Sequence, residues 1–471
     1  MKYIFFNQSS NEKGGVTTLA KHFLNFEKRT IILNLNADFT DIRDCRLKYL
    51  SSDLSHRPQD VAKIIDSIVK KTPSEEFLLI PNFGQLAHTA AALALAKNNN
   101  CRILGVIHNN QQAFYDVLKT FSPAISQYLA VSKFVLKKFA SMVGNDKKIS
   151  VLYPLTTISN LASNINYKEP LRLIYVSRLT NIDKESLRLI PFIETLAKTE
   201  FKFSLDIYGD GPCRADIQSY IDSLQLTNCN ITMHGAQSHN SIERAFSCGD
   251  ILISLSSREG FGMAIAEAMG SRIVPLVMRF EGGICELLKD GLDSFLVEQS
   301  DFQSLAAKLY DLDQDRKLLE KMKNKAALNI KKTQDVKFFF NSFLEIAKAC
   351  FSTKRPEIPI NKVSSMDPMI SYVEEIVANI TRSNHRKISI YGGGFFGRRV
   401  IDRIRDLGIE IMCIYDSCIG ESQKFYEGIM YMPPSQLTDK YPIAVCSIES
   451  KLEIFDILTK KEVNPSKIIT L

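Results

Sequence analysis

Short apolar runs alternate with segments of helical length over the first third of the chain. The runs are YIFF, RTIILNL, EEFLLIP, CRILGVIH, QYLAVS and ISVLYPL. Runs this short suit buried strands, and strands that alternate with helices predict a parallel sheet wrapped by helices. We therefore expect a first α/β domain over residues 1–165.

A second series of the same kind follows a polar break. The stretch TTISNLASNINYKEP interrupts the pattern and ends at Pro170, as is typical of a linker. New strand candidates are LRLIYVS, FSLDIYG, NITMHG, DILISLS and RIVPLV, and helical patterns follow near DLDQDRKLLEKMKNKA and VKFFFNSFLEIAKACF. This series predicts a second α/β domain over residues 166–352.

A third and smaller unit is expected near the end of the chain. The stretch STKRPEIPINKVSSMDP is rich in Pro, Ser and charge, which is typical of a linker. With the helix expected from Met369 to about Thr381, it fills residues 353–385. A strand–turn–helix–strand pattern then runs through KISIYGGGFFGRRVIDRIRDLGIEIMCIYD, and IAVCSI and KIITL supply further strands. Residues 386–471 are therefore predicted to form a small Rossmann-like domain.

The composition fits this division into three domains. A chain of 471 residues is long enough for about three domains, and 45% hydrophobic with 24% charged residues is ordinary for a soluble globular protein. The ten cysteines form no Cys-x-x-Cys pair, which favours a reduced, cytoplasmic protein over a disulfide scaffold or a zinc site. No apolar run approaches the roughly 20 residues that span a bilayer.

The net charge of +7 is unevenly distributed along the sequence. Basic residues gather in residues 101–150, where SKFVLKKF mixes them with aromatic residues on an expected helix. One interpretation is a solvated helix face above a buried aromatic stripe. The other is attraction of residues 133–148 to an anionic membrane surface or an anionic acceptor. Nucleic acid is not expected as a partner, because no stacking platform or reader motif accompanies the charge.

A glycine pair follows the first strand, within NEKGGVTTLAK. A P-loop would need a Gly-Lys pair and then a hydroxyl, but Leu19 and Ala20 stand at the Gly-Lys positions. We therefore exclude an ATP-binding P-loop. The expected strand–turn–helix arrangement still leaves the backbone N–H groups of Gly14 and Gly15 near a helix N-terminus, which is suited to an anion.

The segment around residues 250–298 carries the most informative chemistry. Glu259 and Glu267 are separated by seven residues, the first within the glycine-rich turn EGFG and the second on the helix that follows. The N–H groups of Gly260, Phe261 and Gly262 could hold a phosphate or a sugar, with a carboxylate on either side to accept hydrogen bonds from hydroxyls. The alternative is a pair of solvated glutamates on an amphipathic helix.

This segment resembles the donor-binding core of the family 4 retaining glycosyltransferases, which have two Rossmann-like domains facing a cleft (the GT-B fold). The matching positions are Glu259, Gly260, Gly262, Glu267, Ala268, Met269, Pro275, Gly282, Gly283 and Glu286. The resemblance covers roughly residues 1–350 and implies an acceptor-side domain followed by a domain that binds the nucleotide-sugar donor. The predicted fold class is therefore α/β with GT-B architecture and a third small domain.

The resemblance also implies roles for individual residues. In VSRLTNIDK, Arg178 and Lys184 match the family's Arg and Lys that bind the donor diphosphate, although Lys184 falls one residue late. His108 matches a sugar-contacting histidine. The resemblance implies that Glu259 binds the hydroxyl groups of the donor sugar and that Glu267 binds the ribose hydroxyl groups of the nucleotide. The backbone N–H groups of the glycine pair and of the EGFG turn would assist at the phosphates.

The sequence departs from the family's pattern in several places. Arg272 stands where glycine is usual, and the proline that follows, Pro275, is shifted by one residue. Ser294 stands where glycine is common, and Tyr153-Pro154-Leu155 where the family has Asn-Gly. These departures leave the identity of the donor open. Arg272 also leaves open the hypothesis of a catalytically silent, sugar-nucleotide-binding assembly subunit.

The implied activity is retaining transfer of a hexose-type sugar from a UDP- or GDP-sugar to a glycan or a lipid-linked acceptor. Bacterial surface polysaccharide or cell-envelope glycans are the expected products. The leaving phosphate would take the acceptor's proton, so no carboxylate nucleophile and no cofactor are required. No metal is expected either: DLDQD resembles a metal motif, but the Gly and Glu of an EF-hand are missing.

The third domain contains a second glycine motif. Gly392, Gly394 and Gly397 have Gly-x-Gly-x-x-Gly spacing between an expected strand and helix, and Asp416 ends the next strand. This arrangement is typical of a dinucleotide site and suggests NAD or another nucleotide. An NAD-dependent sugar-nucleotide oxidoreductase or epimerase is therefore the alternative function. A scaffold domain, or a contact between copies of a homo-oligomer, is the other interpretation.

Overall fold

The computed structural model describes most of the chain. The described residues are 1–7, 20, 22–25, 27–34, 47–49, 58–82, 84–109, 112–143, 149–156, 170–181, 184–199, 202–224, 229–280, 282–365, 368–393, 395–416, 424–426, 428–446 and 451–470. The predicted ligand-binding residues Gly14, Gly15 and Gly394 lie outside this set. The chain divides into two compact units. Unit 1 comprises Met1–Ile32, Phe77–Asn82 and Arg102–Pro356, and unit 2 comprises Leu33–Glu76, Phe83–Cys101 and Glu357–Leu471.

The first sheet has seven strands in the order β3-β2-β1-β4-β5-β6-β7, and all of them except β3 (Leu47–Tyr49) lie at least partly in unit 1. The others are β1 (Lys2–Asn7), β2 (Thr30–Asn34), β4 (Phe77–Pro81), β5 (Cys101–Ile107), β6 (Gln127–Ala130) and β7 (Ile149–Val151). The pairs β1–β4, β5–β6 and β6–β7 are parallel. Most residues of these strands are buried, as continuous apolar runs require when helices cover both faces. Helices α4 (Gln112–Thr120) and α5 (Lys133–Val143) belong to this part of the unit.

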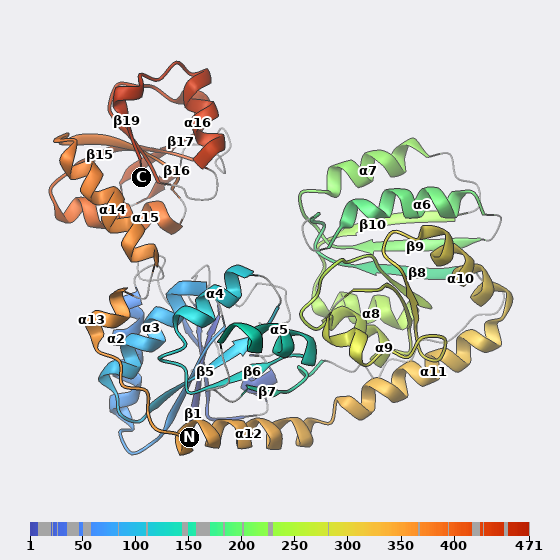
Figure 1. Cartoon of the computed structure of the whole chain (residues 1–471). Coiled ribbons are helices and arrows are strands. Elements are labelled where there is room, and N and C mark those ends of the chain that lie inside the picture. The colour runs from blue at the N-terminus through green and yellow to red at the C-terminus, as the bar shows by residue number, and fades with distance from the viewer. Residues whose placement is uncertain are drawn as a thin grey trace. The chain divides into compact units, whose positions relative to one another are not determined.

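The second sheet of unit 1 has the order β10-β9-β8-β11-β12-β13 and is parallel throughout. Its strands are β8 (Leu171–Val176), β9 (Phe203–Tyr208), β10 (Cys229–Gly235), β11 (Ile251–Ser254), β12 (Val274–Met278) and β13 (Phe295–Val297). Its helices are α6 (Leu189–Ala197), α7 (Arg214–Ser223), α8 (His239–Cys248), α9 (Met263–Gly270), α10 (Phe302–Gln314) and α11 (Arg316–Thr333). Figure 1 shows α6 and α7 on one face of β8–β10 and α8 and α9 on the other.

The strand order of this second sheet reverses between β8 and β11. In open parallel sheets, ligands bind beyond the carboxyl ends of the strands at such a switch point. The loop after β8 contains Arg178 and Lys184, and the loop after β11 contains Glu259. The topology therefore brings the predicted site residues to one edge of one sheet.

The last helix of unit 1, α12 (Val336–Ser352), packs against the first sheet. Phe343 contacts Tyr3 and Phe23, with ring centroids 5.6 and 4.4 Å apart. Gln334, just before the helix, accepts a hydrogen bond from the Thr156 backbone N–H at 2.6 Å. The aromatic run VKFFFNSF thus contributes core to strands that lie more than 300 residues earlier in the sequence.

Unit 2 contains the third sheet, with order β16-β17-β15-β14-β18-β19. Its strands are β14 (Lys387–Tyr391), β15 (Glu410–Tyr415), β16 (Lys424–Tyr426), β17 (Ile429–Met432), β18 (Ile443–Val445) and β19 (Ile468–Ile469). All pairs are parallel except β16–β17. Helices α15 (Phe395–Asp406) and α16 (Lys451–Lys460) follow β14 and β18. This sheet and its helices lie in the part of the chain where a small Rossmann-like domain was predicted, and its assignment as a separate domain stays a prediction.

The remaining elements of unit 2 are β3 (Leu47–Tyr49), α2 (Pro58–Lys71), α3 (Gly84–Lys97), α13 (Ile360–Ser365) and α14 (Pro368–Arg382). Helix α13 lies within the segment expected to be a linker and packs on α3. None of the described helices is both long and apolar enough to cross a bilayer. The domain boundaries at residues 165, 352 and 385 stay predictions.

A buried ion cluster ties the second sheet to α11. Asp250, at the start of β11, accepts hydrogen bonds from the Arg172 side chain at 2.9 and 2.7 Å and from Lys323 Nζ at 2.9 Å. Lys323 on α11 is fully buried. Burial raises the pKa of Asp250, but the hydrogen bonds and charges of Arg172 and Lys323 together hold it below its usual value of 3.8.

Asp250, which pairs with both cations of this cluster, should contribute more to stability than Lys323. Asp250→Asn leaves Arg172 and Lys323 without their counter-charge and is expected to lower the free energy of unfolding by about 3 kcal/mol or more. Lys323→Met leaves the Arg172–Asp250 pair intact and is expected to cost about 1 kcal/mol or less. Denaturant unfolding at pH 7 compares the two variants. Equal losses would contradict the central role of Asp250. Because the pKa of Asp250 is depressed, its contribution should persist at neutral pH and fade as the pH falls below about 3.8.

Candidate functional site

The loops after β8 and β11 meet through an ion pair. Lys184 Nζ donates a hydrogen bond to Glu259 Oε1, and Ser256 Oγ donates to the same oxygen at 3.1 Å. The side chains of Lys184 and Glu259 are 17% and 19% exposed. The predicted phosphate-binding cation and the predicted sugar-binding carboxylate are therefore in direct contact, partly shielded from water but open to a ligand.

A set of hydrogen bonds behind this pair holds the β11 loop in place. Arg188, on the short 3-10 helix η1 (Ser186–Arg188), donates to the Leu255 carbonyl at 3.1 Å and to Gln299 Oε1. The Gln299 amide donates in turn to the carbonyls of Ser256 at 3.3 Å and Arg279 at 2.6 Å. Sequence analysis missed Arg188 and Gln299, because they belong to no recognised motif.

Arg178 lies on the same loop as Lys184, but its side chain is exposed and does not pair with Glu259. Its backbone carbonyl accepts a hydrogen bond from Ser186 Oγ at 3.1 Å, which fixes the loop. Its side chain is exposed and forms no hydrogen bond or ion pair with the other described residues. Arg178 is therefore available to an anion from solvent, and the structure does not bring it to the Lys184–Glu259 pair.

A Gly-x-Gly-Pro turn at Gly209, Gly211 and Pro212, directly after β9, packs against the backbone of the Arg178 loop. Gly209 and Gly211 have φ angles of 146° and 153°, which L side chains rarely adopt. A Cβ atom on Gly209 would lie 1.8 Å from the Ser177 carbonyl oxygen, and one on Gly211 would lie 2.5 Å from that of Leu179. These glycines therefore permit a close backbone approach that any other residue would prevent.

The EGFG turn approaches His108 in the same way. A Cβ atom on Gly260 would lie 1.8 Å from the His108 carbonyl oxygen. Gly262, with φ of 99°, is the N-cap residue of α9, and Phe261 is buried. The His108 ring lies 3.0 Å, Nε2 to Oδ1, from Asn82 after β4. The structure thus places the backbone of His108 against the predicted donor-binding turn.

Glu267 lies on α9 in an environment that disfavours its charge. Burial is the main cause, and the charge of Glu243 on α8 the second, of a pKa raised to about 8. Its carboxyl group forms no hydrogen bond with another described residue. A neutral carboxyl can both donate and accept a hydrogen bond, which suits a pair of hydroxyl groups.

Glu286, on the 3-10 helix η2 (Gly283–Glu286), joins this site to α5. Its carboxylate accepts hydrogen bonds from the backbone N–H groups of Phe134 at 2.7 Å and Lys133 at 3.2 Å, at the positive end of α5. The Tyr153 hydroxyl also donates to it at 2.7 Å. Sequence analysis matched Glu286 to the family pattern without a role, and it took Tyr153 as a departure. The structure shows that the Tyr153 and Glu286 side chains are hydrogen-bonded to each other.

Two of the other departures lie in the scaffold. Arg272 has φ of 61°, a left-handed conformation that explains why glycine is usual there, and its side chain forms an ion pair with Glu320 on α11. Ser294 is buried, and its hydroxyl donates to Asp293 Oδ1 at 3.1 Å. Neither side chain contacts the Lys184–Glu259 pair.

In the third sheet, Asp416 lies beside the glycine motif, as its spacing predicts. Its carboxylate accepts a hydrogen bond from the Gly393 N–H at 2.9 Å. A Cβ atom on Gly397 would lie 1.8 Å from the Gly392 carbonyl oxygen, so this glycine serves close packing of strand and helix. The geometry is that of a Rossmann-like turn, in which the carboxylate of the acidic residue, Asp416, is hydrogen-bonded to a backbone N–H of the turn.

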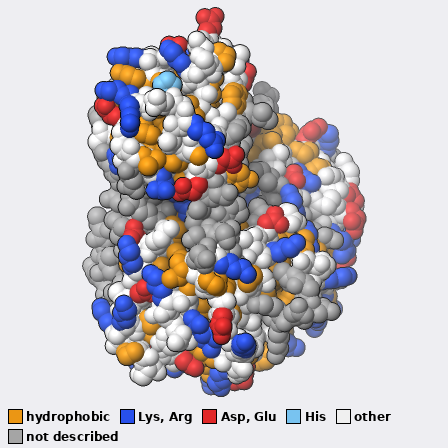
Figure 2. All heavy atoms as spheres, turned by 60° about the vertical axis from the view of Figure 1, so that its left-hand side comes forward, with side chains coloured by type: hydrophobic (Ala, Val, Ile, Leu, Met, Phe, Trp, Pro, Cys, Tyr) orange, Lys and Arg blue, Asp and Glu red, His pale blue; other side chains and the backbone are white. Residues whose placement is uncertain are grey.

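Two further expectations concern a metal site and the basic residues of α5. No group of three or more His, Cys, Asp or Glu side chains in the described parts of the chain is placed to hold a metal ion. Lys133, Lys137 and Lys138 are exposed on α5. On the face shown in Figure 2, Lys and Arg side chains are interspersed with Asp, Glu and neutral side chains.

Residues 159–328 match the family model of the glycosyl transferases group 1. This part of the chain is therefore similar to the group 1 glycosyltransferases, in agreement with the resemblance to glycosyltransferases seen in the sequence. The assignment to family 4 stays a prediction. The matched residues include Arg178, Lys184, Glu259, Glu267 and Glu286.

The curated relatives share part of their length with the chain. The putative colanic acid biosynthesis glycosyltransferase WcaL of Salmonella typhimurium is 27% identical over 270 residues, which are 53% of this chain and 64% of WcaL. The poly(glycerol-phosphate) alpha-glucosyltransferase of Bacillus subtilis is 23% identical over 233 residues, 48% of this chain and 34% of that protein. The chain therefore spans less than two thirds of the length of these relatives.

Solved structures resemble this one over a larger share. Anabaena HepE, crystallised with UDP and glucose, has a TM-score of 0.62 at 19% identity and covers 74% of this chain and 99% of its own. The lipopolysaccharide outer core galactosyltransferase WaaB has a TM-score of 0.57 at 20% identity, covering 75% of this chain and 99% of its own. This likeness confirms the predicted GT-B fold.

The raised pKa of Glu267 gives stability a testable pH dependence. The folded protein keeps the proton up to about pH 8, whereas the unfolded chain releases it near 4.5, so this group lowers stability as pH rises between those values. Glu267→Gln is neutral at every pH. The difference in melting temperature, variant minus wild type, should increase from about pH 5 to about pH 8 and then level off. A flat difference would contradict the assignment. The Glu243→Gln substitution removes one cause of the raised pKa of Glu267. In that background, the melting-temperature difference caused by Glu267→Gln should level off at a lower pH.

The left-handed backbone at Arg272 predicts an unusual order of stability. Arg272→Ala removes the Glu320 ion pair and keeps the strain, whereas Arg272→Gly removes both. The Gly variant should therefore be more stable than the Ala variant by about 1 kcal/mol. Denaturant unfolding measures the difference, and Glu320→Gln reports the ion pair alone. An Ala variant as stable as the Gly variant would show that φ at residue 272 is not strained.

Proposed function

We propose that the protein transfers a sugar, with retention of anomeric configuration, from a nucleotide-sugar donor to a glycan or lipid-linked acceptor. The observation that carries this proposal is the Lys184–Glu259 pair at the switch point of the second sheet, inside the segment that matches the group 1 family. Relatives named for colanic acid and poly(glycerol-phosphate) glycosylation support bacterial surface polysaccharide or cell-envelope glycan as the product.

Breaking the bond between a sugar and a diphosphate builds negative charge on the leaving phosphate, and fixed positive groups there lower the barrier. Lys184 and Arg178 supply that charge. A bound diphosphate replaces Glu259 as the partner of Lys184 and leaves the Glu259 carboxylate to accept hydrogen bonds from the sugar hydroxyls. His108 contacts the sugar, and the neutral Glu267 carboxyl pairs with the ribose hydroxyls.

In the proposed step, the bond between the anomeric carbon and the diphosphate oxygen breaks while the acceptor oxygen bonds to the same face of that carbon. The acceptor's proton passes to the leaving phosphate oxygen. All bonds and charges balance without a metal ion, a carboxylate nucleophile or a redox cofactor. The backbone N–H groups of Gly260 and Gly262 lie near the expected phosphates, at the start of α9.

The donor and the site of action are further parts of the proposal. The HepE structures contain UDP or UDP-glucose, which supports a nucleotide-sugar donor here, and the proposed donor is a UDP- or GDP-sugar. Exposed Lys133, Lys137 and Lys138 on α5 suit attraction to the anionic inner face of the membrane, where a lipid-linked acceptor would be found.

Substitution of the ion pair tests the mechanism. Glu259→Ala and Lys184→Ala should each lower turnover by about 100-fold or more, because each removes a group that acts on the reacting sugar phosphate. Glu298→Ala is a matched control, since Glu298 is an exposed carboxylate paired with Arg279, and it should stay within about twofold of wild type. The readout is nucleotide release from UDP-, GDP-, ADP- and CMP-sugars, with and without EDTA.

The outcomes separate the alternatives. Release from one donor, unaffected by EDTA and lost in Glu259→Ala, supports the metal-independent transferase. Turnover that survives Glu259→Ala but depends on NAD and Asp416 would replace it with the oxidoreductase or epimerase. Donor binding without release under any condition would identify a silent subunit.

A further inference from the structure

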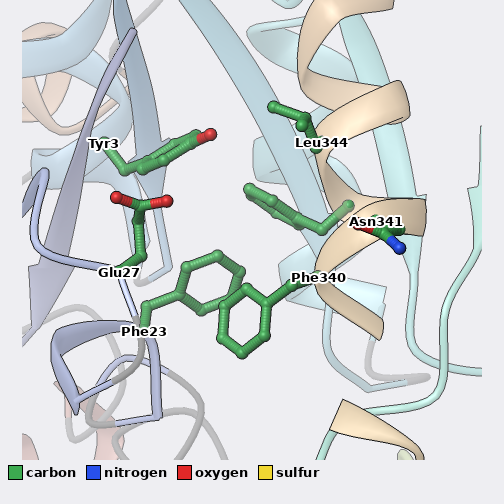
Figure 3. A pocket seen from close by; sticks show the side chains of 7 residues that line it. Tyr3, Phe23, Glu27, Phe340, Asn341 and Leu344 are labelled. Carbon is green, nitrogen blue, oxygen red and sulfur yellow. The ribbon is translucent and has the colours of Figure 1, made fainter. Parts of the chain in front are cut away.

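A pocket lined largely by aromatic side chains lies between β1, the segment before β2 and helix α12. It has a volume of about 160 Å³ and is lined by Tyr3, Phe23, Glu27, Phe340, Asn341, Phe343 and Leu344, here called the aromatic pocket. Figure 3 shows Tyr3 and Glu27 on one side and Phe340 and Leu344 of α12 on the other. The aromatic pocket shares no residue with the site around Lys184 and Glu259.

The hydroxyl group of Tyr3 faces into this pocket and has no hydrogen-bond partner among the described residues. Tyr3 is only 2% exposed, and its hydroxyl forms no hydrogen bond with any residue that the structure describes. In Figure 3 the hydroxyl points toward the space in front of α12. This hydroxyl is therefore available to form a hydrogen bond with a ligand in the pocket, and such a hydrogen bond contributes about 0.5–1.5 kcal/mol.

The charge of the pocket is already balanced. Glu27 accepts two hydrogen bonds from the Arg29 side chain, each at 2.9 Å, and one from the Arg29 backbone N–H at 3.1 Å. The Arg29 side-chain hydrogen bond is the main cause of a Glu27 pKa below its usual value, so the carboxylate is ionised and neutralised. Oε1 receives two of these bonds and Oε2 one, which leaves Oε2 able to accept a further hydrogen bond. A neutral ligand that carries hydroxyl groups fits this state, and a cation does not.

The size of the pocket suits one six-membered ring. A cavity of about 150 Å³ holds a benzene ring, and the aromatic pocket has about 160 Å³, so the ring of a sugar fits while some of its hydroxyl groups extend into the space beside the pocket. A pyranose ring presents C–H groups that pack on the half-buried ring of Phe340, and hydroxyl groups that reach Tyr3 and Glu27. An apolar ring would offer no hydrogen-bond partner to the Tyr3 hydroxyl or to Glu27 Oε2. An adjoining hollow of about 340 Å³, lined by Glu27, Val336, Lys337, Phe340 and Asn341, gives room for the glycan to continue.

We propose that the aromatic pocket binds one sugar residue of a neutral glycan and holds that glycan on the enzyme apart from the transfer site. The proposal rests on the proposed function for the identity of the glycan, which would be the acceptor or the growing product. Such a site raises the effective concentration of a long glycan near the donor without taking part in the reaction.

Saturation-transfer NMR on the full chain tests the proposal with methyl α-glucopyranoside, maltotriose and cellotriose as probes and choline as the cationic comparison. Wild-type protein should transfer saturation to at least one sugar and not to choline. Phe340→Ala removes one wall and should weaken that binding by about tenfold. Phe338→Ala is the matched control, because Phe338 lies on the same helix, is 66% exposed and does not line the pocket. It should bind within about twofold of wild type.

Two further variants keep the result independent of folding and of the transfer reaction. Tyr3→Phe removes only the hydroxyl, so it should weaken sugar binding several-fold while the free protein becomes no less stable. Glu259→Ala should bind the probe sugar like wild type. The proposal is overturned if the wild type binds none of the sugars, if choline binds in their place, if Phe340→Ala and Tyr3→Phe both bind normally, or if Glu259→Ala abolishes binding. Loss of nucleotide release would by itself count against the proposed function and leave the pocket assignment standing.

Discussion

The carboxylate of Glu286 is the contact on which the arrangement of unit 1 depends. It accepts hydrogen bonds from two N–H groups that begin α5 and from the Tyr153 hydroxyl that follows β7. The same 3-10 helix donates a backbone hydrogen bond from Gly283 to the Gly260 carbonyl of the EGFG turn at 3.0 Å. The Glu286 side chain thereby connects the loop after β12 to two segments of the first sheet. Glycine at 260 and 283 allows the close backbone approach that this connection requires, since a Cβ atom on either would overlap a neighbour.

The sequence was sufficient to predict the long strands and the motif residues, because both depend on local pattern. Each buried run such as CRILGVIH or DILISLS became a strand, and the EGFG turn begins α9 where the spacing placed it. The short strands β3, β13, β16 and β17 were not predicted. Each has three or four residues and does not lie within a longer apolar run of the kind that marks the predicted strands, so it is defined by the neighbour it pairs with.

The sequence was sufficient to predict which residues belong to the candidate site, but not which of them contact one another. Lys184 and Glu259 meet because β8 lies next to β11, and strand order is a property of the whole sheet. Arg188 and Gln299 hold the β11 loop through bonds to backbone carbonyls, which leave no recognisable spacing in the sequence. The Tyr3 hydroxyl gave no signal at all, since a tyrosine in a first strand is ordinary core until its surroundings are known.

The packing of α12 on β1 has a consequence for how the chain is made. Phe339 and Phe343 contact Phe23 and complete the apolar core beside the first strand, yet they are synthesised more than 300 residues after it. Until that helix has left the ribosome, the rings of Tyr3 and Phe23 lack the partners that cover them in the folded protein. The N-terminal sheet therefore cannot reach its final packing during synthesis of its own residues, and it must wait for nearly the whole second sheet to be translated.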